Sequence, residues 1–280
     1  MERFAGVPDQ YAVYETAKMV VLPVPYDETS SWIKGSDKGP EALLDASVAL
    51  EWYDIETQTQ VYKKGIFTAL PITEKSSPEL LCNAVQERVT TYLKDGKFPV
   101  TIGGNHTVSI GAIRAAASQY ADLTILQMDA HSDLRPSYEG SQLNHACVMY
   151  QASQLCPITQ VGIRSMCEEE LGLFKEDRIF YAHTIASKSD WQQKALQTLS
   201  KNVYLTIDLD VFDPSVLPST GTPEPGGLRY YEVLHFLRSV FAQYNVVGFD
   251  VVELCPNPNE RASDFLAARL MYQLMTYKFL

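Results

Sequence analysis

The stretch 123-LTILQMDAHSDLR-135 decides the fold of this chain. Its first six residues form a largely apolar run with no clear alternation of polar and apolar positions. Such a run is typical of a parallel strand that is covered on both faces. The run is followed by Asp129, His131 and Asp133, and on an extended backbone side chains at this spacing point to one face. The stretch therefore predicts a buried parallel strand that ends in a polar cluster.

Similar short apolar runs recur along the chain, and stretches of helical length separate them. The predicted strands are 19–23, 98–103, 123–128, 158–162, 178–182, 203–208 and 246–252. The predicted helices are 78–94, 107–120, 190–201, 229–243 and 262–278. Ser77 before Pro78 and Asp190 before Trp191 indicate helix starts. This alternation predicts a single α/β domain over residues 1–280, with a mostly parallel sheet between two layers of helices.

Composition excludes several classes of partner and predicts a compartment. The 280 residues carry a net charge of -11, whereas nucleic-acid backbones and anionic membranes require a basic face. No apolar run approaches the roughly 18 residues of a membrane span. The five cysteines form no CxxC pair, and the first residues do not resemble a secretion signal. These features predict reduced thiols in a cytoplasmic protein that binds neither nucleic acid nor membrane.

A second strand also ends in aspartates. The run 203–208 finishes with Asp208, and Asp210 follows at the same spacing of two, so both carboxylates face one side. Asp213 precedes Pro214, and this pair is more typical of a turn than of a binding site. Because ligands collect at the carboxyl ends of parallel strands, Asp208 and Asp210 are expected to lie near the first cluster.

Two further strand ends carry weaker signals. His106 follows Gly103-Gly104-Asn105 at a predicted helix start, where a lone histidine is usually packed or capping. Glu253 follows the run 246–252, and a single carboxylate there is more often exposed or paired with a basic residue. Both residues gain weight only because they share an edge of the sheet with the two aspartate clusters.

Buried carboxylates are costly unless a cation or arginine lies against them. One alternative is structural, in which Asp133 pairs with Arg135 and His131 caps a helix. Together, however, the clusters supply a hard, oxygen-rich ligand set with two imidazoles, which suits Mn²⁺ better than a cysteine-bound zinc. Four aspartates would balance two divalent cations and favour a cationic substrate. The candidate metal ligands are His106, Asp129, His131, Asp133, Asp208 and Asp210.

These blocks resemble the ureohydrolases, the family of arginases and agmatinases. The similar segments are GGNH at 103–106, DAHSDLR at 129–135, DLDVFDP at 208–214 followed by TGTPEPGG, and VVE ending at 253. They occur in the order found in the family. The continuation of the second block, with Arg135 and then His145, looks more like agmatinases than arginases.

The resemblance implies a role for each matching residue. His106 and Asp133 would bind one manganese, His131 and Asp210 the other, and Asp129 and Asp208 would bridge both. His145 matches the histidine that transfers a proton, Glu253 the carboxylate that grips the guanidinium, and Asp133 would also orient the attacking water. The implied fold is an eight-stranded parallel sheet flanked by helices, in subunits that assemble as trimers or hexamers.

The sequence departs from the family pattern at two places and leaves the substrate open. Asn105 stands where an acidic residue is usual, and Ser219 interrupts a segment that often reads PGTGTP. We expect agmatine, cleaved to urea and putrescine, because a site rich in aspartates favours a cationic tail. One of the glutamates at 168–170 could face that ammonium, whereas Arg135 or Arg164 could instead hold the carboxylate of arginine.

Three alternatives remain at this stage. The chain could be a ureohydrolase for guanidinobutyrate, guanidine or arginine. It could be a homologue that binds metal without catalysis, or a mononuclear zinc amidohydrolase similar to the deacetylases. The doubled ligand set disfavours the last two.

Overall fold

All eight strands belong to one parallel sheet in the computed structural model, which describes residues 2–280. The order across the sheet is β2-β1-β3-β8-β7-β4-β5-β6. The fold class expected from the alternation of strands and helices is confirmed. The strands are β1 (Met19–Val24), β2 (Ile66–Thr68), β3 (Phe98–Gly103), β4 (Leu123–Met128), β5 (Ile158–Ile163), β6 (Ile179–Tyr181), β7 (Asn202–Asp208) and β8 (Asn245–Val252).

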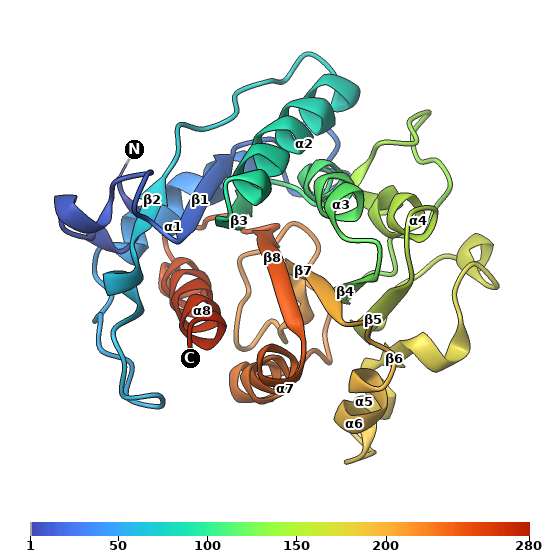
Figure 1. The fold of residues 1–280 in the computed structure, drawn as a ribbon. Coiled ribbons are helices and arrows are strands. Elements are labelled where there is room, and N and C mark those ends of the chain that lie inside the picture. Colours follow the sequence, from blue (N-terminus) through green and yellow to red (C-terminus); the bar gives the residue numbers. More distant parts are fainter. Residues whose placement is uncertain (1) are drawn as a thin grey trace.

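Helices cover both faces of the sheet, as Figure 1 shows. Helices α2, α3 and α4 pack on one face, and α1, α6, α7 and α8 pack on the other, so the apolar core forms two separate clusters. The helices are α1 (Gly39–Ser47), α2 (Pro78–Lys94), α3 (Val108–Gln119), α4 (Val148–Ser153), α5 (Ala182–Ile185), α6 (Trp191–Leu196), α7 (Tyr230–Gln243) and α8 (Ala262–Lys278). Within residues 2–280 no helix is both long and apolar enough to cross a membrane.

The sequence predicts the longer elements well and the shorter ones less well. Ser77 caps α2 as expected, because its hydroxyl accepts a hydrogen bond from the backbone N–H of Leu80 at 3.2 Å. Asp190 does not cap α6: its carboxylate instead pairs with Lys194 one turn later, and the helix ends at Leu196 rather than near 201. The sequence prediction missed β2, α1, α4 and α5.

The sheet order brings four chain segments together at the carboxyl-terminal end of the sheet. Strands β3, β8, β7 and β4 are consecutive neighbours in the middle of the sheet, although they are far apart in sequence. Their carboxyl ends lead to His106, Glu253, Asp208 and Asp129 respectively. The turn after β3 passes so close to its neighbour that a Cβ atom at Gly104 would lie 1.9 Å from the Tyr26 carbonyl oxygen. Glycine is therefore required where the chain turns toward His106.

Candidate active site

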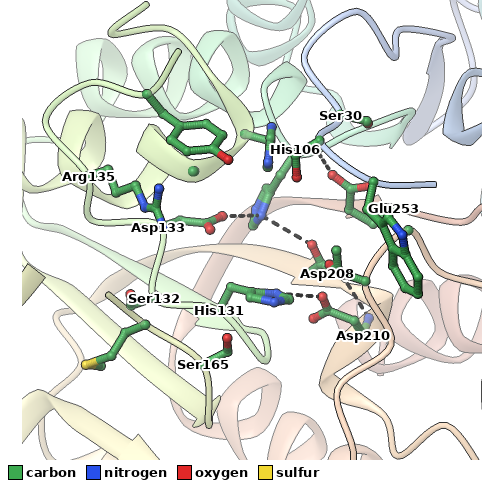
Figure 2. A pocket seen from close by; sticks show the side chains of 18 of the residues that line it. Ser30, His106, His131, Ser132, Asp133, Arg135, Ser165, Asp208, Asp210 and Glu253 are labelled. Carbon is green, nitrogen blue, oxygen red and sulfur yellow. Dashed lines mark hydrogen bonds and ion pairs between the residues drawn. The ribbon is translucent and has the colours of Figure 1, made fainter. Parts of the chain in front are cut away.

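A cavity of about 210 Å³ opens at this end of the sheet (Figure 2). Except for Asp129, which is fully buried beside His106, every residue that the sequence singled out as a metal ligand or a catalytic group lines the cavity. The strands thus bring together side chains that are up to 147 positions apart.

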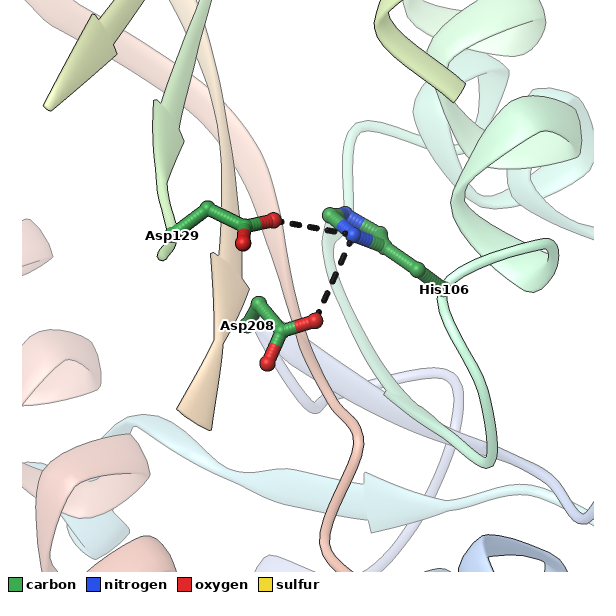
Figure 3. Close-up of side chains that lie close together, drawn as sticks. All are labelled: His106, Asp129 and Asp208. Atoms are coloured by element: carbon green, nitrogen blue, oxygen red, sulfur yellow. Dashed lines mark ion pairs between the residues drawn. The ribbon is translucent and has the colours of Figure 1, made fainter. Parts of the chain in front are cut away.

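The first group of possible ligands surrounds His106 (Figure 3). Its Nδ1 atom lies 3.2 Å from Asp129 Oδ2, 3.5 Å from Asp208 Oδ2 and 2.9 Å from Asp133 Oδ2. Despite these neighbours Nδ1 is buried and has no hydrogen-bond partner of suitable geometry among the described residues. A buried polar atom of this kind needs a ligand, and three carboxylates at this distance suit a cation.

The second group shares Asp129 with the first. His131 Nδ1 lies 2.8 Å from Asp210 Oδ2 and 3.7 Å from Asp129 Oδ1. Within each group, His106 with Asp129 and Asp208, and His131 with Asp129 and Asp210, one ligand atom per residue lies within 4.8 Å of the others. Two adjacent triads with a common aspartate can hold two cations side by side.

Backbone and side-chain donors orient these carboxylates. Asp129 accepts hydrogen bonds from the Gln127 amide at 2.7 Å and from the backbone N–H of His131 at 2.6 Å. Asp210 accepts from the backbone N–H of Ala130 at 2.9 Å, and the Asp210 N–H donates to Asp208 at 2.9 Å. The carboxylates are therefore preorganised by the strand ends that carry them.

The ionisation of the site reflects crowded negative charge. Burial, together with the charges of Asp210 and Asp133, raises the pKa of Asp129 to about 7. Burial and the same kind of repulsion hold the pKa of Asp208 well above its usual range. Burial opposes the charge of His131, but Asp210 and the neighbouring carboxylates raise its pKa to about 10. Without a cation, Asp129 and Asp208 therefore retain protons more readily than ordinary aspartates. A bound divalent cation would displace these protons.

Donor chemistry and geometry thus fit two divalent cations. Each triad offers one imidazole nitrogen and two carboxylates, and none of the five cysteines is in either triad. Oxygen-rich sites with imidazole suit hard or borderline ions, and these two triads cannot form a cysteine-bound zinc site.

Asp133 reaches His106 from a strained turn. Its φ is +52°, a left-handed conformation that is rare for residues other than glycine. Glu170 is buried and fixes the turn, because its carboxylate accepts from the Ser132 hydroxyl and from the Leu134 N–H, both at 2.7 Å. The backbone N–H of Met149, near the start of α4, donates to the Asp133 carbonyl at 2.9 Å.

Glu253 lies across the cavity from Arg135 and Asp133 in Figure 2. It too has a positive φ, +65°, and its Oε1 accepts from the backbone N–H of His106 at 2.7 Å. Burial raises the pKa of Glu253 to about 8. The second oxygen, Oε2, makes no hydrogen bond within the described residues, so the carboxylate can still accept from a ligand in the cavity.

His145 also lines the cavity. Burial lowers the pKa of His145, so its ring is neutral near pH 7. Its Nδ1 is buried without a partner among the residues described, and the ring packs edge-on against Tyr138 at 5.8 Å. A neutral imidazole with an unpartnered nitrogen can accept or relay a proton.

A buried chain of hydrogen bonds lies behind His106. The His106 Nε2 atom is 2.8 Å from Thr206 Oγ1, and that hydroxyl donates to Asp250 Oδ1 at 2.6 Å. The Tyr204 hydroxyl donates to the other Asp250 oxygen at 2.8 Å. Because Thr206 donates to Asp250, its oxygen accepts the Nε2–H of His106, and Nδ1 is the nitrogen that faces the carboxylates. Burial opposes a charge on this ring, but Asp129 and Asp133 hold the pKa of His106 well above its usual range, so a bound cation would take the place of a proton at Nδ1.

Several sequence expectations about neighbouring residues are now decided. Asp133 does not pair with Arg135, whose guanidinium instead covers the Tyr138 ring at 4.5 Å. Arg164 does not face the cavity as an anion site, because its guanidinium donates to backbone carbonyls, including that of Asp210 at 2.6 Å. Among the glutamates at 168–170 only Glu170 lines the cavity, and three donors occupy its carboxylate.

The structure also shows the contacts of Asp213 and of the two residues that depart from the family pattern, Asn105 and Ser219. Asp213 forms the predicted turn, because its carboxylate accepts from the Ser215 and Gly226 N–H groups. Asn105 is buried and donates to the Thr29 hydroxyl at 2.7 Å. Ser219 donates to Glu260 at 2.8 Å, so its hydroxyl ties the loop after β7 to the start of α8.

The sequence analysis missed the residues that support the ligands. Gln127, Thr206 and Asp250 are polar residues inside otherwise apolar strands, and this anomaly was an available signal. Glu170 gave no comparable signal, because its role depends on which loop folds over the turn at Asp133.

Comparisons with known proteins agree with this geometry. The family model described as the Arginase family matches residues 17–277. An N(1)-aminopropylagmatine ureohydrolase from Synechocystis is 41% identical, with 98% of this chain and 95% of the relative covered. An agmatinase from Halalkalibacterium halodurans is 33% identical, covering 92% of this chain and 93% of the relative. The agmatine ureohydrolase structure of Thermoplasma volcanium superposes with a TM-score of 0.90 at 31% identity, over 100% of this chain and 94% of that one.

The parallel sheet carries at its acidic end a site that fits two divalent cations, and the relatives with this site are named as hydrolases of amidino compounds. The chain belongs to the arginase family. The resemblance inferred from the sequence blocks is thereby confirmed.

Proposed function

We propose that this protein is a binuclear manganese hydrolase that cleaves agmatine to urea and putrescine. The observation that carries the proposal is the pair of ligand triads that share Asp129, next to a cavity lined by Glu253 and His145. Membership of the arginase family supports hydrolysis of an amidino group.

Six residues would hold the cations: His106, Asp129, His131, Asp133, Asp208 and Asp210. Two adjacent divalent ions lower the pKa of water and polarise the group under attack. Manganese is the proposed ion because the donors are mostly carboxylates. Asp133 approaches His106 from the cavity side, where its carboxylate can accept a hydrogen bond from the attacking water.

Glu253 and His145 would handle the substrate. The free oxygen of Glu253 can accept from the planar N–H groups of a guanidinium, a pairing with good geometry and complementary charge. His145, whose ring is neutral near pH 7, would take up the proton that the attacking water loses and pass it to the departing nitrogen, so that the amine leaves in a stable form.

The tail of the substrate is argued from the remaining charges. Arg164 is occupied by carbonyl groups, so only Arg135 among the cavity residues offers a guanidinium to a substrate carboxylate. The net charge of -11 and the partly exposed Glu224, whose Oε1 lies 4.0 Å from His131 Nε2, favour a cationic tail over an anionic one. The name of the Synechocystis relative makes N(1)-aminopropylagmatine a second candidate.

Urea release tests the proposal directly. The manganese-loaded protein should release urea from agmatine with a higher kcat/KM than from arginine, guanidinobutyrate or guanidine. A higher value for arginine or guanidinobutyrate would refute the tail assignment. One bound zinc without urea release from any compound would refute the binuclear mechanism.

We also propose that residues 1–280 form a single ureohydrolase domain and that the subunits assemble as trimers or hexamers in the cytoplasm. The continuous sheet supports the single domain. Sedimentation velocity would give the subunit number, and a monomer would contradict the assembly.

A further inference from the structure

An exposed indole stands at the mouth of the cavity. Trp32 lines the cavity, yet its side chain is 69% exposed. Within residues 2–280 no other aromatic ring packs on it and no lysine or arginine covers it. Ile33 beside it also lines the cavity and is 42% exposed. Such exposure of two large apolar side chains at a cavity mouth is typical of a surface that meets a ligand.

The loop that carries Trp32 is held firmly against the site. Asp27 is buried, and its carboxylate accepts from the Gly35 N–H at 2.5 Å, from the Ser36 hydroxyl at 2.9 Å and from Ser30. Asp27 thus joins the residues before Trp32 to the residues after it.

A second set of bonds ties the loop to the ligand segment. The Thr29 hydroxyl lies 2.9 Å from that of Thr107 and accepts from Asn105 at 2.7 Å. Asn105 and Thr107 flank His106 in sequence. The backbone on both sides of Trp32 is therefore tied to the segment that carries His106, and Asn105, a departure from the family pattern, supplies one of the ties.

The acids near the cavity leave few partners for a distant ammonium. Apart from the ligand carboxylates and Glu253, the remaining acid of the lining is Glu170, which already accepts from three donors. Glu224 lies outside the lining, and its Oε1 is 4.0 Å from Nε2 of the ligand His131. Arg135 covers the ring of Tyr138 and would repel a cation there. Tyr138 is in contact with Arg135 and His145, whereas no ring or cation contact is found for Trp32 within residues 2–280.

We propose that Trp32 is the subsite for the second, outer amine of an extended guanidino polyamine, with N(1)-aminopropylagmatine as the test compound. The proposal rests on the proposed function, because it presumes a guanidinium held at Glu253. The indole face attracts an ammonium through its negative quadrupole, and Trp32 with Ile33 can cover the propyl methylenes. Trp32 would determine specificity without taking part in bond cleavage.

The test compares two substrates in two variants and a control. Trp32→Ala should lower kcat/KM for N(1)-aminopropylagmatine roughly three- to thirtyfold, whereas that for agmatine should change less than about twofold. Trp32→Phe keeps an aromatic face and should retain most of the activity toward the longer substrate. Tyr231→Ala removes an aromatic side chain of similar exposure, 67%, outside the cavity and should change neither value.

A binding measurement separates this proposal from the proposed function. Spermidine, the amine that would remain after urea leaves the longer substrate, should alter the indole fluorescence of the manganese-loaded protein, and putrescine should alter it less. Trp32→Phe should abolish this signal, because Trp52 and Trp191 lie outside the cavity.

The outcomes are distinct. If Trp32→Ala lowers kcat/KM equally for both substrates, or for neither, the subsite is wrong and the proposed function stands. If the wild type prefers agmatine over the longer substrate, the extended tail is likewise refuted. If no urea is released from either compound, the proposed function fails, and a spermidine signal that requires Trp32 would still support the amine subsite.

Discussion

Asp133 and Glu253 share an unusual backbone conformation. They are two of five non-glycine residues with positive φ within the described chain, and both line the cavity. Strained residues persist where the surroundings fix them, and they cluster at functional sites. Hydrogen bonds from Met149 and Tyr150 to the Asp133 carbonyl, and from the Glu253 N–H to Gly104, provide that support here. The strain places each carboxylate where an ordinary strand end would not.

Substitution of Asp129 should disturb both metal sites. Its carboxylate is the one that belongs to both ligand triads. Asp129→Ala should therefore lower the manganese content from two ions per chain to less than one, whereas His131→Ala should leave one tightly bound ion. Elemental analysis after gel filtration measures this. Equal losses in the two variants would contradict the shared ligand.

Loss of His145 should impair turnover and spare the metals. His145→Gln should lower kcat by roughly 10²–10⁴, the range usual for general acid–base groups. Manganese content should not change, since His145 belongs to neither triad. A variant that loses stability but keeps full turnover per folded molecule would identify His145 as a packing residue instead.

At the scale of elements, strands β7 and β8 do more than carry ligands at their ends. Thr206 lies within β7 and contacts the back of the His106 ring, and Asp250 in β8 accepts a hydrogen bond from Thr206. Thr206→Val keeps the shape of the side chain but removes the oxygen that accepts from Nε2. Such support of a ligand is typically worth 10- to 100-fold in metal affinity. We therefore expect Thr206→Val to weaken manganese binding by about that factor, as measured by electron paramagnetic resonance of the free ion.

Thr206→Ser is the matched control, because it retains the hydroxyl. It should keep near-native manganese affinity. If serine and valine variants lose affinity alike, packing of the threonine methyl, and not the hydrogen bond, is responsible.

The sequence predicts an element where its own residues suffice to define it. Helix α8 was predicted with the observed bounds, and β4 and β7 were placed so that their polar ends mark the site. Strand β2 has only three residues at the sheet edge, and the nine-residue helix α1 depends on packing against α8. Short elements of this kind are stable only through tertiary contacts, which a pattern of residues does not contain. Trp32 was missed for the same reason, and Glu170 was considered only as a partner for a substrate ammonium, because loop folding alone brings them to the cavity.

At the scale of the whole molecule, the acidic site should make the metal-free protein sensitive to pH. Burial raises the pKa of Glu253 to about 8 from an ordinary value of 4.5. The pKa values of Asp129 and His131 are also raised. At a pH between the ordinary pKa of such a group and its raised pKa in the folded protein, the folded state binds more protons than the unfolded state. The free energy of unfolding therefore falls as pH rises through this range. Urea unfolding after metal removal should therefore show lower stability at about pH 8 than at about pH 6.

Manganese should reverse this trend, because the ion binds the ionised ligands of the folded state. Glu253→Gln should flatten the pH dependence of the metal-free protein, and Glu139→Gln, an exposed control, should not. A metal-free protein that gains stability over this pH range would contradict the protonation assigned to the site.

The position of β8 between β3 and β7 has a consequence for biosynthesis. The strand made last occupies the middle of the sheet, so a nascent chain on the ribosome can join β1 to β3 and β4 to β7 but cannot unite these two halves. Until residues 245–252 emerge, the inner edges of β3 and β7 remain unpaired, which exposes them to wrong pairing. His106 and Asp208 meet only when β8 inserts, and the cations are therefore captured by a nearly finished molecule rather than serving as a nucleus for its folding.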